Sequence, residues 1–135
     1  MSNEKLYQEE LMEHYRFPKN RKNIHDPDFS SKQFNPSCGD KISIEGKIKK
    51  ETDSSGSIII SELGFQGAGC VISQATASML TQYCIGKSID QVLNFNKDDI
   101  IKIIKLKLGP TRLRCALLSL EALKDALNSF KKEHK

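Results

Sequence analysis

The pattern of hydrophobic and polar positions changes period along the chain. Tyr7, Leu11 and Tyr15 stand four apart, as on one face of a helix, whereas residues 41–48 alternate between apolar and polar, as in a half-buried strand. These two periods predict a helix over 3–16, strands over 41–48 and 58–65, and helices over 71–85, 89–94, 97–108 and about 112–130. Residues 20–36 show neither period, so we expect a loop there with at most one short edge strand near 29–34.

Turn and capping residues mark the ends of these elements. Ser88 stands three residues before Gln91, which is the spacing of a capping box, and Asn96 is a suitable cap for the helix that follows it. Gly86 closes the helix before them, and Gly109-Pro110 breaks the helix after them. The chain shows no internal repeat or linker, which predicts one α+β domain over residues 1–135 with a small antiparallel sheet packed by helices.

Length and composition exclude several classes of protein. A chain of 135 residues can bury a core without disulfides or metal, and no apolar run approaches the ~20 residues of a membrane span. The N-terminus has no apolar segment of a secretion signal, so we expect a cytoplasmic protein whose thiols stay reduced. The net charge of +4 comes from scattered lysines and arginines without interleaved aromatics, so neither nucleic acid nor membrane is expected as a partner.

The four cysteines are too far apart to form a local metal motif. They stand at Cys38, Cys70, Cys84 and Cys115, so no Cys-x2-4-Cys pair of a zinc finger or ribbon exists. Three of them have a suggestive setting. Cys38 lies in a Pro/Gly turn before a strand, Cys70 follows a glycine-rich strand end at a predicted helix start, and Cys115 is predicted in the first turn of the last helix. The residues alone do not decide whether these cysteines form one shared site or are buried or incidental cysteines without a common role.

Five other residues bear on that question. Asp40 stands two positions from Cys38, so in an extended segment both side chains point to one side, although a strand-entry aspartate is the commoner role. Arg114 precedes Cys115 and is either a solvated helix residue or a counter-charge for a site of thiolates. Cys84 is about four turns along the helix from Cys70, which favours a core thiol outside any site. His14 and His25 have no partner at ligand spacing.

Motifs spread over nearly the whole chain resemble the U-type iron–sulfur assembly proteins, the scaffold family of NifU N-terminal domains, IscU and SufU. The segments that carry this resemblance are Leu6–Asn20, Asn35–Asp40, Gly67–Ser78, Gly86–Ser88 and Pro110–Leu118. The resemblance implies a SufE/NifU-like, IscU-type fold, in which a three-stranded antiparallel sheet has helices packed on one side. It also implies that Cys38, Asp40, Cys70 and Cys115 bind zinc (Zn2+) or a nascent [2Fe-2S] cluster.

Two departures from the family's pattern concern its branches. The IscU branch has a histidine before the last cysteine, whereas this chain has Arg114, which stays protonated and cannot coordinate a metal. That branch also has a Leu-Pro-Pro-Val-Lys motif for an Hsp70-type chaperone, and Leu108–Arg112 departs from it, which argues against docking. The site residues are closest to SufU, but the interval from Cys70 to Cys115 is too short for the SufU insertion.

The resemblance implies an iron–sulfur cluster assembly protein. Its partners would be a cysteine desulfurase of the SufS or IscS type, which donates persulfide sulfur, and recipient apo-proteins. We predict Cys115 as the sulfur acceptor, with Cys70 as the alternative, because release of Cys115 leaves three ligands in place. A zinc-dependent sulfurtransferase that relays sulfur without hosting a cluster is the alternative function, and a plain interaction protein with a structural zinc is a further one.

Overall fold

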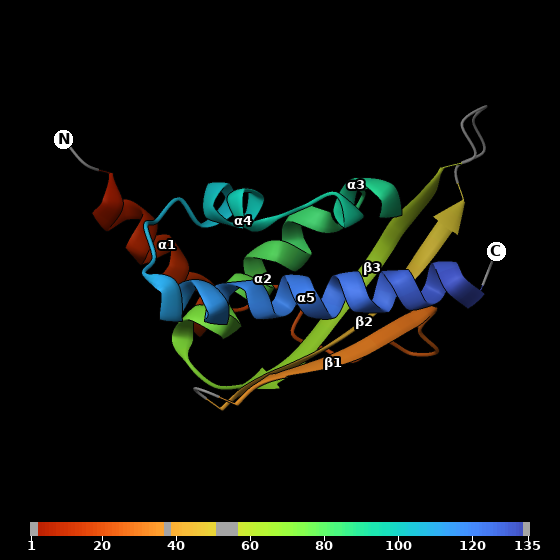
Figure 1. The fold of residues 1–135 in the computed structure, drawn as a ribbon, viewed down its shortest axis with the longest axis horizontal. Coiled ribbons are helices and arrows are strands. Elements are labelled where there is room, and N and C mark those ends of the chain that lie inside the picture. The colour runs from red at the N-terminus through yellow and green to blue at the C-terminus, as the bar shows by residue number, and fades with distance from the viewer. Residues whose placement is uncertain (1–2, 37–38, 51–56, 134–135) are drawn as a thin grey trace.

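The computed structural model describes residues 3–36, 39–50 and 57–133 (Figure 1). The elements follow in the order α1 (Glu4–Arg16), β1 (Phe29–Asn35), β2 (Asp40–Lys50), β3 (Ile58–Ala68), α2 (Val71–Cys84), α3 (Ile89–Leu93), α4 (Lys97–Ile104) and α5 (Pro110–Glu133). None of the described helices is long and apolar enough to cross a membrane. The fold is α+β, as the sequence predicts, and residues 51–56 between β2 and β3 lie outside the described residues.

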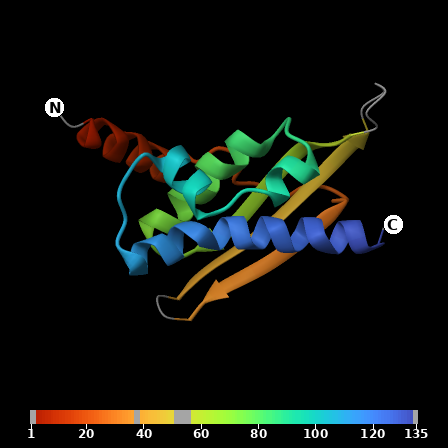
Figure 2. The same ribbon diagram turned by 45° about the horizontal axis from the view of Figure 1, so that its top comes forward.

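The three strands form an antiparallel sheet in the order β1-β2-β3. Alternate residues of β2 are buried, among them Asp40, Ile42 and Ile44. Lys41, which lies between Asp40 and Ile42, is exposed. The helices α2 and α5 pack on the buried side, and Figure 2 shows α5 running across the sheet. One face of the sheet therefore meets the helices, and the other carries none of the described helices.

The core lies between the sheet and helices α2 and α5. The apolar stripe of α5 is buried, and its members are Ala116, Leu120, Leu123, Leu127 and Phe130. The face predicted for the first helix is only partly buried, because Tyr15 is 39% exposed, and Tyr83 of α2 is 49% exposed. Tyr83 lies near the end of α2, where its ring packs at 5.7 Å from Phe95 and under the Lys87 ammonium instead of in the core.

Element boundaries match the predictions at the caps and differ at two junctions. Both predicted caps are present, since Ser88 and Asn96 each make a capping box. The helix α4, however, ends at Ile104 rather than near residue 108, because Lys105 adopts a left-handed conformation with φ of 64°. Pro110 does not merely break that helix but begins α5, where a missing N–H costs nothing and the fixed φ favours a helix.

Candidate metal centre

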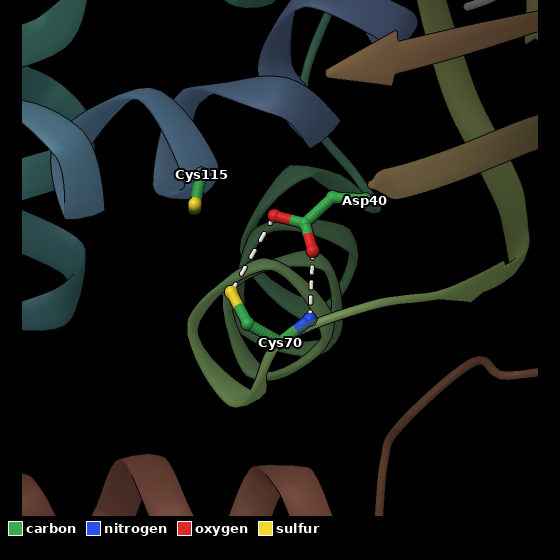
Figure 3. A group of neighbouring side chains, drawn as sticks. All are labelled: Asp40, Cys70 and Cys115. Carbon is green, nitrogen blue, oxygen red and sulfur yellow. Dashed lines mark hydrogen bonds between the residues drawn. The ribbon is translucent and has the colours of Figure 1, made fainter. Parts of the chain in front are cut away.

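Three of the four predicted ligands meet at one end of the sheet. Asp40 is the first residue of β2, Cys70 precedes α2 and Cys115 lies in α5. One ligand atom from each residue lies within 4.8 Å of the other two, and Figure 3 shows the side chains directed toward one another. Residues 30 and 45 positions apart in the sequence are therefore brought together by the strand and the two packed helices. Cys38, the fourth predicted ligand, lies outside the described residues.

Two hydrogen bonds join Asp40 to Cys70. The amide nitrogen of Cys70 donates to Oδ1 of Asp40 at 2.7 Å, and the Cys70 thiol donates to Oδ2 at 3.4 Å (Figure 3). Cys70 is the N-cap residue of α2 but makes no capping hydrogen bond with its own side chain. The carboxylate of Asp40, which is fully buried, accepts from the amide of this N-cap residue, as the N3 side chain does in a capping box, and a negative charge is favourable at a helix N-terminus. Asp40 thus supports the helix with one oxygen and faces Cys70 Sγ with the other.

Gly69 allows Asp40 to approach the helix so closely. Its φ of 138° is one that L side chains rarely adopt, and a Cβ added there would overlap Oδ1 and lie 2.8 Å from Cα of Asp40. The strand β3 continues to Ala68, three residues beyond the predicted end at residue 65, so Gly64 and Gly67 lie within it. Gly69 follows the strand and makes room for the buried carboxylate.

The setting of Cys115 differs from the prediction. Because α5 begins at Pro110, Cys115 is in the second turn of the helix and not in the first. The field of a helix N-terminus falls off within the first turn, so it acts less on this thiol than the sequence suggested. Cys115 is instead 4% exposed, while Cys70 is only partly buried.

The spacing of these donors suits a tetrahedral zinc ion. Zinc bonds of about 2.3 Å to sulfur and 2.0 Å to oxygen at a tetrahedral angle place the two atoms about 3.5 Å apart. Cys70 Sγ and Asp40 Oδ2 are 3.4 Å apart. Since Oδ1 is already held by the amide of Cys70, the geometry favours a carboxylate that binds through Oδ2 alone. The residues fit a metal, and a cysteine from the segment before Asp40 would complete four ligands.

The other candidates lie outside this group. Cys84 is fully buried, and desolvation raises its pKa from 9.0 to about 12, an effect that nearby Lys87 partly opposes. His14 Nδ1 lies 2.7 Å from Ser78 Oγ, and burial lowers its pKa. Arg114 is exposed, and its side chain forms no hydrogen bond or ion pair with the described part of the chain. The prediction that Cys84 is a core thiol is correct.

Two supporting residues were not identified from the sequence. The Asn35 side chain is buried, and the backbone carbonyl of Asn35 accepts from the Gly39 amide at 2.8 Å. The Ser73 hydroxyl donates to the Cys70 carbonyl at 3.1 Å. Asn35 stands directly before the Pro-Ser-Cys-Gly segment, and this position was the available signal for it, whereas nothing in the sequence distinguishes Ser73 from other helix serines.

An open three-stranded antiparallel sheet with helices on one face places the chain in the α+β class of folds. Residues 6–135 match the family model described as the NifU-like N terminal domain. The chain therefore belongs to this family, as the motifs at Cys38, Cys70 and Cys115 predict.

Relatives of known name come from both branches of the family. The chain is 34% identical to the zinc-dependent sulfurtransferase SufU of Bacillus subtilis, over 87% of this chain and 86% of that protein. It is 33% identical to the iron–sulfur cluster assembly enzyme IscU of Drosophila melanogaster, over 93% of this chain and 79% of that protein. Among solved structures, the putative SUF-system scaffold of Fervidobacterium islandicum superposes with a TM-score of 0.68 at 25% identity, covering 93% of this chain and 99% of that one.

Proposed function

We propose that this chain is an iron–sulfur cluster assembly protein that accepts sulfur from a cysteine desulfurase and binds zinc or a nascent [2Fe-2S] cluster. The observation that carries the proposal is the convergence of Asp40, Cys70 and Cys115 from three distant segments, with ligand atoms within 4.8 Å of one another. Cys38 is the proposed fourth ligand. The relatives named as cluster assembly proteins and as a zinc-dependent sulfurtransferase support the same two functions.

The donor set suits transient binding. Thiolates are soft ligands that suit zinc and iron–sulfur clusters, whereas the Asp40 carboxylate is a hard oxygen ligand and exchanges more readily. Bound zinc would keep the coordinating sulfurs deprotonated. In this proposal Asp40 is the labile ligand, and its second oxygen stays on the Cys70 amide when the metal or cluster leaves.

Cys115 is the proposed sulfur acceptor. Its thiolate attacks the outer sulfur of the desulfurase persulfide, the sulfur–sulfur bond breaks, and the desulfurase cysteine leaves as a thiolate with the electron pair. Cys115 then carries the persulfide, and no external oxidant or reductant is needed. The support is that the Cys70 amide holds the Asp40 carboxylate by a hydrogen bond in which Cys115 takes no part. Cys70 is the alternative acceptor, since it is the more exposed thiol of the two.

Single-turnover sulfur transfer tests this assignment. A desulfurase loaded with persulfide is mixed with wild-type protein, Cys115→Ser or Cys70→Ser, and each product is analysed by intact-mass and peptide mass spectrometry. The expected result is one additional sulfur on Cys115 of the wild type and none on Cys115→Ser, although that variant still binds the desulfurase. Cys84→Ser is the matched control and should accept sulfur normally. Normal transfer to Cys115→Ser would refute the assignment, and its loss in Cys70→Ser alone would favour Cys70.

A zinc-dependent sulfurtransferase is the second candidate, and Arg114 favours it. This residue cannot coordinate a metal, and it stands directly before a proposed ligand, where another ligand could otherwise help to hold a cluster. Anaerobic reconstitution with iron and sulfide separates the two functions. A stable visible chromophore indicates a scaffold, whereas one tightly bound zinc per chain and no chromophore indicates a transfer enzyme.

A further inference from the structure

The face of the sheet that carries no helix is open beside the metal centre. Phe34 of β1 pairs with Lys41 of β2, and Lys32 pairs with Ser43. These four residues point away from the helices, because the alternate positions of the same strands are the ones that face the helical layer. Lys41 directly follows Asp40, so this surface begins at the proposed ligand.

A groove of about 500 Å³ lies on this surface. Its lining includes Lys32, Phe34, Lys41, Ser43, Gln66 and Gly67. We call these six residues the outer groove. Phe34 is 58% exposed, although it is one of the largest apolar side chains of the protein. An exposed aromatic side chain in a groove is typical of a surface that binds a partner.

The middle of this face is covered by the loop before β1. Ile24 is buried, its amide donates to Glu45 Oε1 at 3.1 Å, and it would contact a Cβ placed at Gly64. Farther along the loop, the carbonyl of Asn20 accepts from the amide of Phe65 at 2.9 Å. The loop before β1 therefore shields the middle of this face, and the outer groove lies at the end of the face that adjoins the metal centre.

The charges around the outer groove are positive. Lys32 and Lys41 flank Phe34 and are exposed, and the Arg21 guanidinium donates to the Gly67 carbonyl at 3.1 Å on the rim. No acidic side chain lines the groove among the described residues, and neighbouring Glu45 already accepts from a backbone amide. An occupant with carboxylates and an apolar side chain is complementary to this surface.

We propose that the outer groove docks an acidic polypeptide segment of a protein partner. An apolar side chain of the segment packs on Phe34, and its carboxylates meet Lys32 and Lys41. A single-stranded nucleic acid fits less well, because binding without sequence preference uses several aromatic side chains for successive bases and the groove has one. A second copy of this chain carries a net charge of +4 itself. The proposal concerns partner recognition and goes beyond the metal and sulfur chemistry of the site.

A short fluorescein-labelled peptide that alternates glutamate and leucine is the probe. Its affinity is measured by fluorescence anisotropy, and the binding site is mapped by amide chemical shifts of the full-length protein. We expect shifts at the outer groove, a loss of affinity of about tenfold in Lys32→Glu, and a loss of about fivefold in Phe34→Ala. Lys49→Glu, with the same charge change on an exposed residue at the far end of β2, is the matched control and should bind within about twofold of wild type.

Several outcomes would overturn the proposal. They are absence of binding to the wild type, equal weakening by Lys32→Glu and Lys49→Glu, or shifts confined to the basic C-terminal segment. If oligodeoxythymidylate displaces the peptide and binds more tightly, the outer groove is a nucleic-acid-binding surface instead. If the protein self-associates and Phe34→Ala abolishes this, the outer groove is a contact between copies of the chain instead. Unchanged zinc content and unchanged urea unfolding of the variants exclude damage to the fold or the metal centre as the cause.

Discussion

Replacing Gly69 by alanine tests how the metal centre is built. The substitution forces a side chain into a backbone conformation with φ of 138° and into the space occupied by the Asp40 carboxylate. A non-glycine residue in such a region costs about 1–3 kcal/mol. Overpacking of a filled site adds about 1–3 kcal/mol, so we expect a total loss of about 3 kcal/mol or more in the free energy of unfolding.

Two other glycines separate these contributions. Gly86 also has a positive φ, 95°, but a Cβ there meets no atom within 4 Å, so Gly86→Ala carries the backbone strain alone. Gly109 has neither a positive φ nor a neighbour within 4 Å, and Gly109→Ala should be nearly neutral. Urea unfolding of the three variants should therefore rank them Gly109→Ala, Gly86→Ala and Gly69→Ala in order of increasing loss.

Zinc affinity gives the second readout. Chelator competition should show a loss of about 10- to 100-fold in Gly69→Ala, since a displaced Asp40 no longer presents Oδ2 beside Cys70, and little change in the two controls. The stability cost of Gly69→Ala should also be smaller in an Asp40→Ala background, because part of the overlap is removed with the side chain. Equal stability of Gly69→Ala and Gly86→Ala, together with wild-type zinc affinity in both, would refute the reasoning.

Two further predictions concern Asp40 and Cys84. Asp40→Ala removes the acceptor of the Cys70 amide and should lose about 0.5–2 kcal/mol of stability, whereas Asp40→Asn keeps an acceptor and should lose less. If the protein is a scaffold, the visible absorption of the reconstituted cluster should decay more slowly in Asp40→Ala than in the wild type. If the zinc is purely structural, Asp40→Ala should only be destabilised. Cys84 should resist iodoacetamide in the native protein and react in urea. Because the folded-state pKa of Cys84 is raised from 9.0 to about 12, its protonated form contributes stability that is lost as the pH rises through this window. In urea unfolding, the stability of Cys84→Ala should therefore fall less steeply with pH over this range than that of the wild type. The same slope in both proteins would contradict the burial of this thiol.

Much of the fold was predictable because its signals are local. The alternation over 41–48, the capping residues Ser88 and Asn96 and the stripe of α5 each depend on neighbours in sequence, and all appear in the structure. The start of α5 was missed by two residues because Pro110 was taken as the end of one helix instead of the first residue of the next. That small difference moves Cys115 out of the first turn.

Contacts between distant segments were less predictable. The resemblance indicated that Asp40, Cys70 and Cys115 share a site, but not that the Asp40 carboxylate caps α2 or that Gly69 makes room for it. The contact of Ile24 with the sheet face that bears the outer groove could not be predicted, because residues 20–36 show neither helical nor strand periodicity. These features depend on which surfaces pack together, and no local pattern encodes them.

X-ray absorption spectroscopy of the zinc-loaded wild-type protein tests the central claim most directly. If Cys38, Asp40, Cys70 and Cys115 bind one metal ion, the spectrum should fit three sulfur neighbours at about 2.3 Å and one oxygen at about 2.0 Å. Cys84→Ser should give the same shell, since this buried thiol lies outside the group. A shell of nitrogen and oxygen alone, or one with fewer than three sulfurs at a stoichiometry of one zinc per chain, would contradict the shared site.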